Sequence, residues 1–274
     1  MRSSYYSFFQ FSLLLFSFMS CQEASSNIPA QSTPDWAELP ALKNKKVLIV
    51  HGGWDGHKPD LYAQKVNKWL MEAGAQVTVS DSLGIYKNET LMAEMDLIIQ
   101  SVTLGKLSPD EFKGLEKAVK NGAGFAGSHG GFCDAFRNHT EYQYMTGGQF
   151  VKHPGGQVDH IVNIIDPDDP ITRGVPDFET HTEQYYMHID PNVKVLATTT
   201  FNGEHDNWIE GAVVPVIWKK YHGKGRIFCI TIGHDPNEFD EPIPQKLLLN
   251  GFRWASGSKY EPMENWLRPV YQKN

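Results

Sequence analysis

Histidines stand at the ends of three expected strands of this 274-residue chain. His51, His129 and His234 each follow a short apolar run and lie next to a glycine. If these runs are parallel strands of one sheet, their carboxyl ends share one edge, which is where open α/β sheets bind ligands. Glycine at these turns permits positive φ angles and close backbone approach. Because imidazole changes its charge near neutral pH and binds metals when neutral, the pattern indicates acid–base or metal chemistry on one rim.

The segment around His129 is the most informative of the three. Residues 127–131 read Gly-Ser-His-Gly-Gly, the spacing of a sharp strand-to-helix elbow that presents a nucleophile at its centre. His129 occupies that central position, where a Ser, Cys or Asp nucleophile would otherwise stand. Acyl-enzyme chemistry is therefore disfavoured, and His129 is expected to act as a general base or a metal ligand.

Further histidines and aromatic residues lie in loops near these strand ends. His57, His153 and His181 occur in segments that we expect to be loops, where one histidine alone is most often only solvated. Flat aromatic rings beside them suit sugar faces as well as ordinary packing. The residues expected to bind substrate are His51, Trp54, Phe132, Tyr185, Tyr186 and Trp208.

Alternating strand and helix patterns predict an α/β fold with three layers, of the flavodoxin-like type, built on a mostly parallel sheet. Strands are expected at 46–50, 76–80, 95–101 and 124–128, with helices at 60–73 and 108–121. Past Phe150 the pattern predicts an antiparallel extension with strands at 159–165, 194–199, 213–219 and 226–232, the last two forming a hairpin. A helix at 243–254 closes the fold.

The first residues carry an export signal. Arg2 precedes an apolar stretch at 8–19, which is short for a membrane span and typical of a signal peptide over 1–20. Residues 18–21 (Phe-Met-Ser-Cys) resemble a bacterial lipobox, which predicts a lipid on Cys21; cleavage of an ordinary signal peptide is the alternative. Residues 21–43 are then a flexible tether, 44–258 the domain and 259–274 a tail. Gln22 and Glu23 favour the outer membrane, facing the periplasm.

Charge, missing motifs and cysteine content exclude several functions. The net charge of -7 is spread along the chain, so nucleic acid is not an expected partner. Neither a phosphate-binding loop nor G-x-G-x-x-G follows the first strand, so no nucleotide cofactor is expected. If Cys21 carries lipid, only Cys133 and Cys229 remain for a disulfide, and Cys229 in its apolar run is interpreted as a core residue. The oligomeric state is left open.

Taken together and in order, the motifs from residue 45 to 255 resemble the ThuA-like family (trehalose utilisation), which is placed with the class I glutamine amidotransferase-like folds. The matching motifs are residues 47–50, Gly56 and His57, 122–125, 127–129 with Asp134 and Phe136, 147–150 with His153 and Pro154, Glu183 with Tyr185, 215–218, 225–228, and Gly233 with His234. Thr182 departs from the acid expected beside Glu183. His129 stands where that superfamily has its nucleophilic cysteine, so amidotransferase activity is not expected.

The resemblance implies carbohydrate catabolism, with a 3-keto sugar or glycoside as substrate. A base near C2 would then support elimination, hydrolysis or isomerisation. His129 or His234 is the expected base, oriented by Asp134 or Glu183. A divalent metal such as zinc, held by His57, His129, His153 or His234, would polarise the ketone. A carbohydrate-binding lipoprotein without turnover and a metal-dependent glycoside hydrolase are the alternatives.

Overall fold

The computed structural model describes Met1 and residues 38–264. The expected signal peptide, Cys21 and most of the expected tether lie outside the described residues. Within the described part, nine strands form one sheet in the order β2-β1-β3-β4-β11-β10-β9-β6-β7. The strands of this sheet are β2 (Gln76–Ser80), β1 (Lys46–Gly53), β3 (Leu97–Thr103), β4 (Gly124–Ser128), β11 (Gly225–Ile230), β10 (Val213–His222), β9 (Lys194–Thr200), β6 (Gln157–Ile164) and β7 (Phe178–Glu183).

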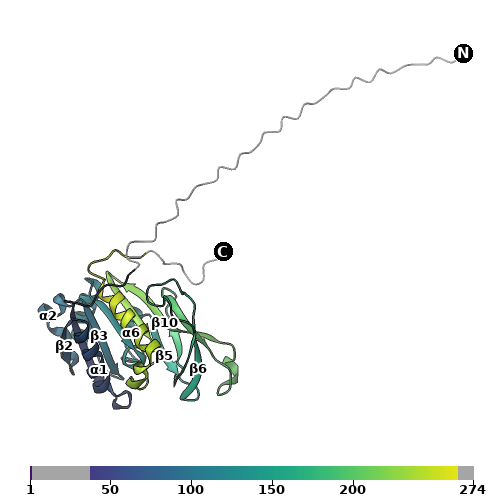
Figure 1. Cartoon of the computed structure of the whole chain (residues 1–274), viewed down its shortest axis with the longest axis horizontal. Helices are drawn as coiled ribbons and strands as arrows, with labels where there is room; N and C mark the ends of the chain where they lie inside the picture. Colours follow the sequence, from purple (N-terminus) through teal and green to yellow (C-terminus); the bar gives the residue numbers. More distant parts are fainter. Residues whose placement is uncertain (2–37, 265–274) are drawn as a thin grey trace. The chain divides into compact units, whose positions relative to one another are not determined.

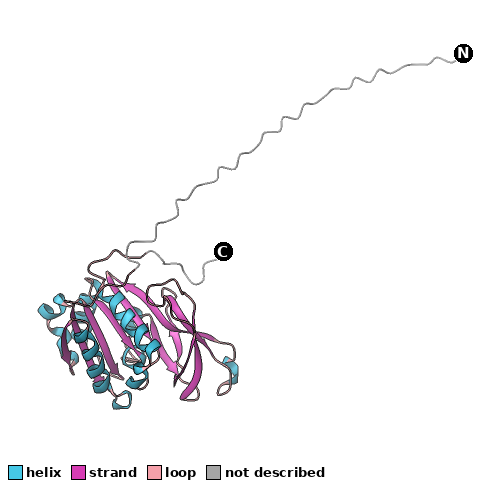
Figure 2. Cartoon of the chain, in the orientation of Figure 1, coloured by secondary structure: helices cyan, strands magenta, loops and turns pink. Residues whose placement is uncertain are grey.

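The sheet changes character at β11. From β2 to β11 all neighbouring strands are parallel, and from β11 to β7 all are antiparallel. The predicted mostly parallel sheet with an antiparallel extension is therefore confirmed, as is the hairpin between β10 and β11. The five parallel strands deliver their carboxyl ends to one edge, and the extension widens the sheet beside them (Figures 1 and 2).

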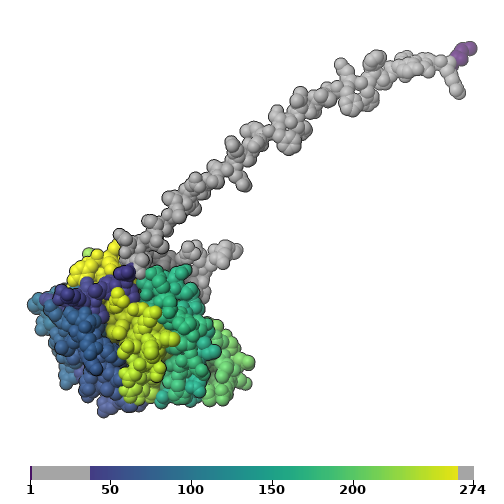
Figure 3. Space-filling model, in the orientation of Figure 1, coloured from purple at the N-terminus to yellow at the C-terminus, as the bar shows by residue number. Residues whose placement is uncertain are grey.

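Helices cover both faces of the parallel part and make the three layers. On one face α1 and α6 pack against β1, β3 and β11, and the other face is covered mainly by η2, α2, α3, α4 and α5. In Figure 3, α6 lies across the molecule between the first elements of the fold and the extension. The helices are α1 (Pro59–Glu72), α2 (Glu89–Glu94), α3 (Pro109–Lys120), α4 (His129–Cys133), α5 (Thr140–Thr146) and α6 (Pro242–Ser256), and the 3₁₀ turns are η1 (Asp55–His57), η2 (Leu83–Lys87), η3 (Asn207–Ile209) and η4 (Pro236–Asp240).

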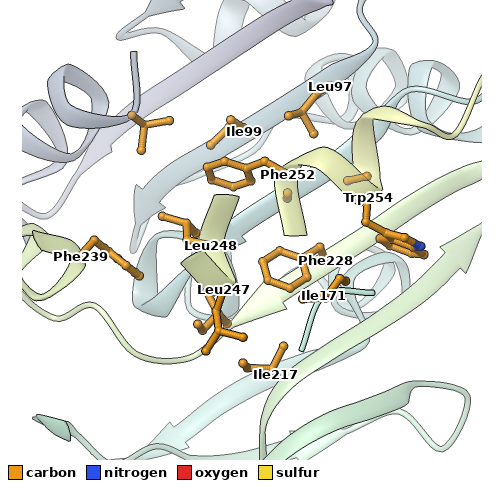
Figure 4. Packing of buried hydrophobic residues seen from close by; sticks show 14 of the residues in the cluster. Leu97, Ile99, Ile171, Ile217, Phe228, Phe239, Leu247, Leu248, Phe252 and Trp254 are labelled. Carbon is orange, nitrogen blue, oxygen red and sulfur yellow. The ribbon is translucent and has the colours of Figure 1, made fainter. Parts of the chain in front are cut away.

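The core under α6 is built from close contacts between aromatic and aliphatic side chains. Phe228 of β11 and Leu248 and Phe252 of α6 are fully buried in one cluster (Figure 4). Gly251 allows α6 to approach the sheet, because a Cβ atom there would lie 2.1 Å from Cε1 of Phe228. This packing sets the distance between β11 and α6. The chain continues from β11 into the loop that carries His234.

The sequence patterns missed the more polar elements. His181, expected in a loop, lies in β7, and a separate two-stranded ladder joins β5 (Gly148–Lys152) to β8 (Tyr186–Ile189). Strand β7 reads Phe-Glu-Thr-His-Thr-Glu, is largely accessible and has no apolar run, so its strand character comes from pairing with β6. The loop expectation for His181 is therefore wrong.

Both ends of the segment 38–264 are hydrogen-bonded to the domain, the first end to α6 and the last end to α6 and β10. Arg253 donates hydrogen bonds to the carbonyl oxygens of Leu39 and Pro40. Glu264 accepts from the buried ammonium group of Lys219 at 2.8 Å and from the indole of Trp254 at 2.6 Å. Packing thus continues through Glu264, beyond residue 258, where the domain was expected to end. Among the described residues, no helix has the length and apolar character needed to cross a membrane.

Replacing Phe252 with alanine tests the core. The change removes a fully buried aromatic ring, and we expect the free energy of unfolding to fall by about 3–5 kcal/mol. Chemical denaturation measures it. The matched control is Met71→Ala on α1, whose side chain is exposed, with an expected change within about 0.5 kcal/mol. Equal stabilities of the two variants would contradict this description of the core.

Candidate functional site

Four side chains from separate parts of the chain converge at the carboxyl edge of the sheet. His57 follows β1, His129 follows β4, Glu183 ends β7 and His234 follows β11. One ligand atom from each lies within 4.8 Å of the others. Because β3 separates β1 from β4, the loop after β1 must bend over the end of β3 to bring His57 to the group.

His129 is held in a strained position by the elbow. Its φ angle is 47°, in the left-handed region that residues with a side chain seldom adopt. Its Nδ1 lies 2.7 Å from the carbonyl oxygen of Thr231, which can only accept, so Nδ1 carries the proton. The other nitrogen, Nε2, faces the Glu183 carboxylate at 3.0 Å and the Tyr185 hydroxyl at 2.7 Å. A buried imidazole with its outer nitrogen fixed to a backbone carbonyl is a common arrangement for a metal ligand.

His57 is neutral at physiological pH. Burial, together with the neighbouring His129 and His234, lowers the pKa of His57 to about 3. Its Nδ1 forms a hydrogen bond of 2.9 Å with the hydroxyl of Thr103 at the end of β3. The ring of Trp54 meets it edge-on, with centroids 4.8 Å apart. The second nitrogen of a neutral imidazole held in this way is free to bind a ligand.

Glu183 supplies the negative charge of the group. Burial acts to raise the pKa of Glu183, but its contacts with His129 and His234 outweigh burial and hold that pKa well below its usual range. The same carboxylate raises the pKa of His234, whose Nδ1 lies 3.2 Å away. That nitrogen is buried and has no hydrogen bond of good geometry. Within this group, Nδ1 of His234 is therefore a buried nitrogen whose lone pair or proton is not used in a hydrogen bond.

Ion pairs and hydrogen bonds outside the group fix its loops. Lys58, directly after His57, pairs with Asp235, directly after His234, at 2.6 Å, which joins the loops after β1 and β11. Glu238 accepts hydrogen bonds from the backbone of Gly233 and Asp235 at 2.9 Å and from the hydroxyl of Thr182 at 3.0 Å. Thr182, where the family resemblance led us to expect an acid, thus connects β7 to the loop that carries His234.

The remaining residues expected at the site lie at different distances from it. Nε2 of His153 is 3.7 Å from Glu183, and this ring is partly exposed. Both oxygens of Asp134 are bound by Arg137, at 2.7 and 2.8 Å, so its carboxylate contacts Arg137 in place of a histidine. His51 lies 3.0 Å from Asp60 in a separate hollow beside α1.

The expected aromatic residues also divide between site and core. Tyr185 contacts His129 directly, and Trp54, about half exposed, stands beside His57. Phe132 is fully buried and packs against Phe125 and Tyr142 in the core. Tyr186 packs on Phe201. Trp208 is exposed in η3.

Two residues that hold the histidines were not singled out from the sequence. The Thr103 hydroxyl and the Thr231 carbonyl each fix one imidazole. Threonine is common in strands, and a backbone carbonyl carries no sequence signal. Only the position of Thr103 at the end of β3 and of Thr231 directly after β11 could have indicated that they lie near the histidines.

The donor set fits a first-row divalent metal. Imidazole nitrogen suits zinc, iron, nickel and copper, and one carboxylate oxygen completes four ligands, the number typical of zinc. Neutral His57 is in the state that metal binding requires, and the hydrogen bond from Nδ1 of His129 to Thr231 leaves Nε2 as the nitrogen that faces the group. Glu183 takes the place that the sequence had suggested for His153.

Comparison with known families matches residues 46–255 to ThuA, described as trehalose utilisation. The chain belongs to the ThuA family. This membership gives it a role in carbohydrate metabolism and confirms the resemblance found in the motifs.

Solved structures of other ThuA-like proteins share the fold. One from Bacteroides uniformis matches with a TM-score of 0.64 and 18% identity, covering 80% of this chain and 92% of that chain. One from Parabacteroides merdae matches with a TM-score of 0.63 and 18% identity, covering 84% and 96%. A glutamine amidotransferase from Thermotoga maritima matches with a TM-score of 0.41 and 13% identity, covering 79% and 94%. No curated protein matches this chain.

The low pKa of His57 predicts a pH dependence of stability in metal-free protein. Between pH 3 and 6.5 the unfolded chain binds a proton at His57 that the folded chain does not, so stability falls as the pH is lowered through 6.5. Unfolding followed from pH 5 to 8 in the presence of a chelator should show this slope. In His57→Asn the free energy of unfolding should change less with pH, by an amount that corresponds to at most one bound proton. An unchanged slope in the variant would show that His57 is not held neutral.

Gly130 tests how tightly the group is packed. A Cβ atom there would lie 2.4 Å from Cε1 of His57 and 3.1 Å from the Tyr185 hydroxyl. We expect Gly130→Ala to fold but to displace His57, so that any affinity for added zinc falls by about 10- to 100-fold in chelator competition. The control is Gly84→Ala in η2, where a Cβ atom meets only the Ser82 hydroxyl at 3.2 Å and the far end of Lys87. Wild-type affinity in Gly130→Ala would contradict the assigned place of His57.

Proposed function

We propose that this chain is an enzyme of carbohydrate catabolism that acts on an oxidised, 3-keto sugar or glycoside with the help of a divalent metal. The observation that carries the proposal is the convergence of His57, His129, Glu183 and His234 within 4.8 Å, with His57 neutral and Glu183 ionised. Family membership supplies the substrate class at the level of carbohydrates. The ketone accounts for the use of a metal and a base, because neither is needed merely to hold a sugar.

A bound metal would supply Lewis acidity at the keto oxygen, which makes the neighbouring C2 proton more acidic. His57, His129, Glu183 and His234 are the residues that would hold it. The fixed hydrogen bonds of His129 to Thr231 and of His57 to Thr103 set the ring orientations in advance. Such positioning outside the ligands commonly changes metal affinity or activity by 10- to 100-fold.

In this proposal His153 accepts the C2 proton. Its side chain is 42% exposed, in contrast to 2% for His129, and its Nε2 lies beside Glu183 at the open side of the group. The ring stacks with Phe150 at a centroid distance of 5.6 Å, which restricts its orientation. Since both nitrogens of His129 already have partners, His153 reaches a substrate more readily.

In this proposal Tyr185 donates a hydrogen bond to the developing oxyanion. Burial raises the pKa of Tyr185 well above its usual value, so the hydroxyl stays protonated at neutral pH. Its oxygen now lies 2.7 Å from Nε2 of His129, and it becomes available when that nitrogen binds another group. A fixed donor in a water-poor site is an effective way to stabilise such a charge.

The substrate has an entry beside these residues. Trp54 presents a half-exposed ring next to His57, which suits the flat face of a sugar. Next to His234, a hollow of about 720 Å³ is lined by residues that include His181, Asp235 and Glu238. In a substrate with two sugar units, the unit that does not react would occupy this hollow.

These positions support a balanced elimination. Removal of the C2 proton by His153 leaves an electron pair that forms the C1=C2 double bond as the bond from C1 to its oxygen substituent breaks. The departing oxygen takes a proton, which yields an alcohol and an unsaturated keto sugar. Addition of water to that product gives net hydrolysis, and return of the proton on another carbon gives isomerisation.

Turnover of 3-keto-trehalose and 3-keto-glucose by metal-free and metal-loaded protein tests the proposal. We expect activity to disappear with a chelator and to return with zinc or another first-row metal. His153→Gln should keep the metal and reduce kcat by about 10²- to 10⁴-fold, the usual contribution of a general base. His234→Gln should lose the metal together with activity.

The matched control is His222→Gln, a histidine at the end of β10 whose ring is paired with Glu116 of α3, away from the group and from the hollow. It should keep both metal content and kcat. Activity that survives complete metal removal would overturn the metal's role. Tight sugar binding without turnover would identify a carbohydrate-binding protein in place of an enzyme.

A further inference from the structure

Two cysteines that are distant in the sequence meet in the core behind the elbow. Sγ of Cys133, in α4, lies 3.1 Å from Sγ of Cys229, in β11. The two side chains are 1% and 0% exposed. They are the cysteines of the described residues, and the chain's third, Cys21, belongs to the expected export segment. Two cysteines separated by 96 positions have thus been brought into contact by the fold alone.

The contact depends on glycine in the elbow. In the parallel pairing of β4 with β11, Gly127 is the register partner of Cys229. A Cβ atom on Gly127 would lie 2.6 and 2.8 Å from side-chain atoms of Phe132, so α4 can fold back onto β4 only because residue 127 lacks a side chain. This return of the chain places Cys133 over the neighbouring strand.

Apolar side chains surround the two thiols, and the polar contact of each is the other thiol. Both belong to the apolar cluster that includes Phe125, Phe132 and Trp218. Burial raises the pKa of the Cys229 thiol well above its usual value, so it is protonated and unreactive once the protein has folded. Oxidation therefore has to take place during folding, before the cluster closes.

We propose that Cys133 and Cys229 form a structural disulfide in the exported protein, which covalently links the elbow helix α4 to β11. The proposal rests on the export expected from residues 1–21, since disulfides persist in oxidising compartments. It is independent of the proposed reaction.

The oxidant is the disulfide of a thiol–disulfide oxidoreductase. In the folding chain, the thiolate of one cysteine attacks that disulfide and forms a mixed disulfide, and the second cysteine then displaces the oxidoreductase sulfur. The two thiols lose two protons and two electrons, and the incoming disulfide gains them to become a dithiol.

This bond would stabilise the part of the fold that holds the site. Helix α4 begins at His129, and β11 runs into Thr231, whose carbonyl fixes His129, and on to His234. A link between α4 and β11 joins the elements that bear two of the four converging side chains. Because it closes a long loop, it also limits the unfolded state strongly.

The experiment uses the full chain with its own N-terminal segment, expressed in a bacterium and recovered from the cell envelope. Free thiols are blocked with iodoacetamide after unfolding without reductant, and the protein is digested under non-reducing conditions. We expect a peptide pair linked through Cys133 and Cys229, and an unalkylated protein about 2 Da lighter than the reduced form. Alkylation of both cysteines in the envelope protein would overturn the proposal.

A stability measurement separates the bond from mere packing. Refolding in reductant should lower the Tm of the wild-type protein by roughly 10 °C, as the length of the closed loop implies for a domain of this size. The Cys133→Ala, Cys229→Ala double variant should show the same Tm with and without reductant. A wild-type Tm that does not respond to reductant would also contradict the proposal.

Discussion

The carboxylate of Glu183 is the charge around which the candidate site is organised. His129 and His234 lie 3.0 and 3.2 Å from its Oε2, and His57 packs against both of these rings. Without an anion at this point, protonation of one imidazole would oppose protonation of the next, and burial would oppose both. With it, the group separates into a neutral His57 and a His234 whose pKa is raised. The neutral imidazole of His57 and the carboxylate of Glu183 suit metal binding, whereas His234 has to lose any proton at the binding nitrogen before it can hold a metal.

The fold keeps this set together through tight backbone packing. The left-handed φ of His129 and the lack of a side chain at Gly130 let two imidazoles from different loops come within 4.7 Å of each other, centroid to centroid. The strain at His129 persists because Thr231, Tyr185 and Glu183 all bind its ring. The hydrogen bonds therefore stabilise a conformation that the local sequence alone would disfavour.

Much of this arrangement could be predicted from the sequence because it depends on local patterns. Apolar runs ending in glycine and histidine predicted the parallel strands and indicated His51, His129 and His234 at one edge. His129 and His234 lie in the group, and the third imidazole there is His57 of the following loop. The fourth member of the group was harder to predict. Glu183 ends a polar edge strand that has no apolar run, so the sequence favoured His153 as the metal ligand, although the two lie only 3.7 Å apart.

Other features depend on contacts that a linear pattern cannot show. Asp134 was expected to orient a histidine, but Arg137, three positions along, binds both of its oxygens. Phe132 follows the elbow closely in sequence, yet the short helix turns its ring into the core. His51 stands next to the two glycines that end β1 and contacts Asp60 of α1. In each case the side chain has a partner within the fold, Arg137, the core or Asp60, that the local sequence pattern did not indicate.

The central claim is that these four side chains form one metal site, and anomalous X-ray scattering from crystals of the natively purified protein tests it most directly. We predict one strong anomalous peak, with Nε2 of His129 and a carboxylate oxygen of Glu183 at about 2.0–2.2 Å and with His57 and His234 completing the ligands. A peak held by other residues, or crystals soaked in zinc that show none at this position, would contradict it.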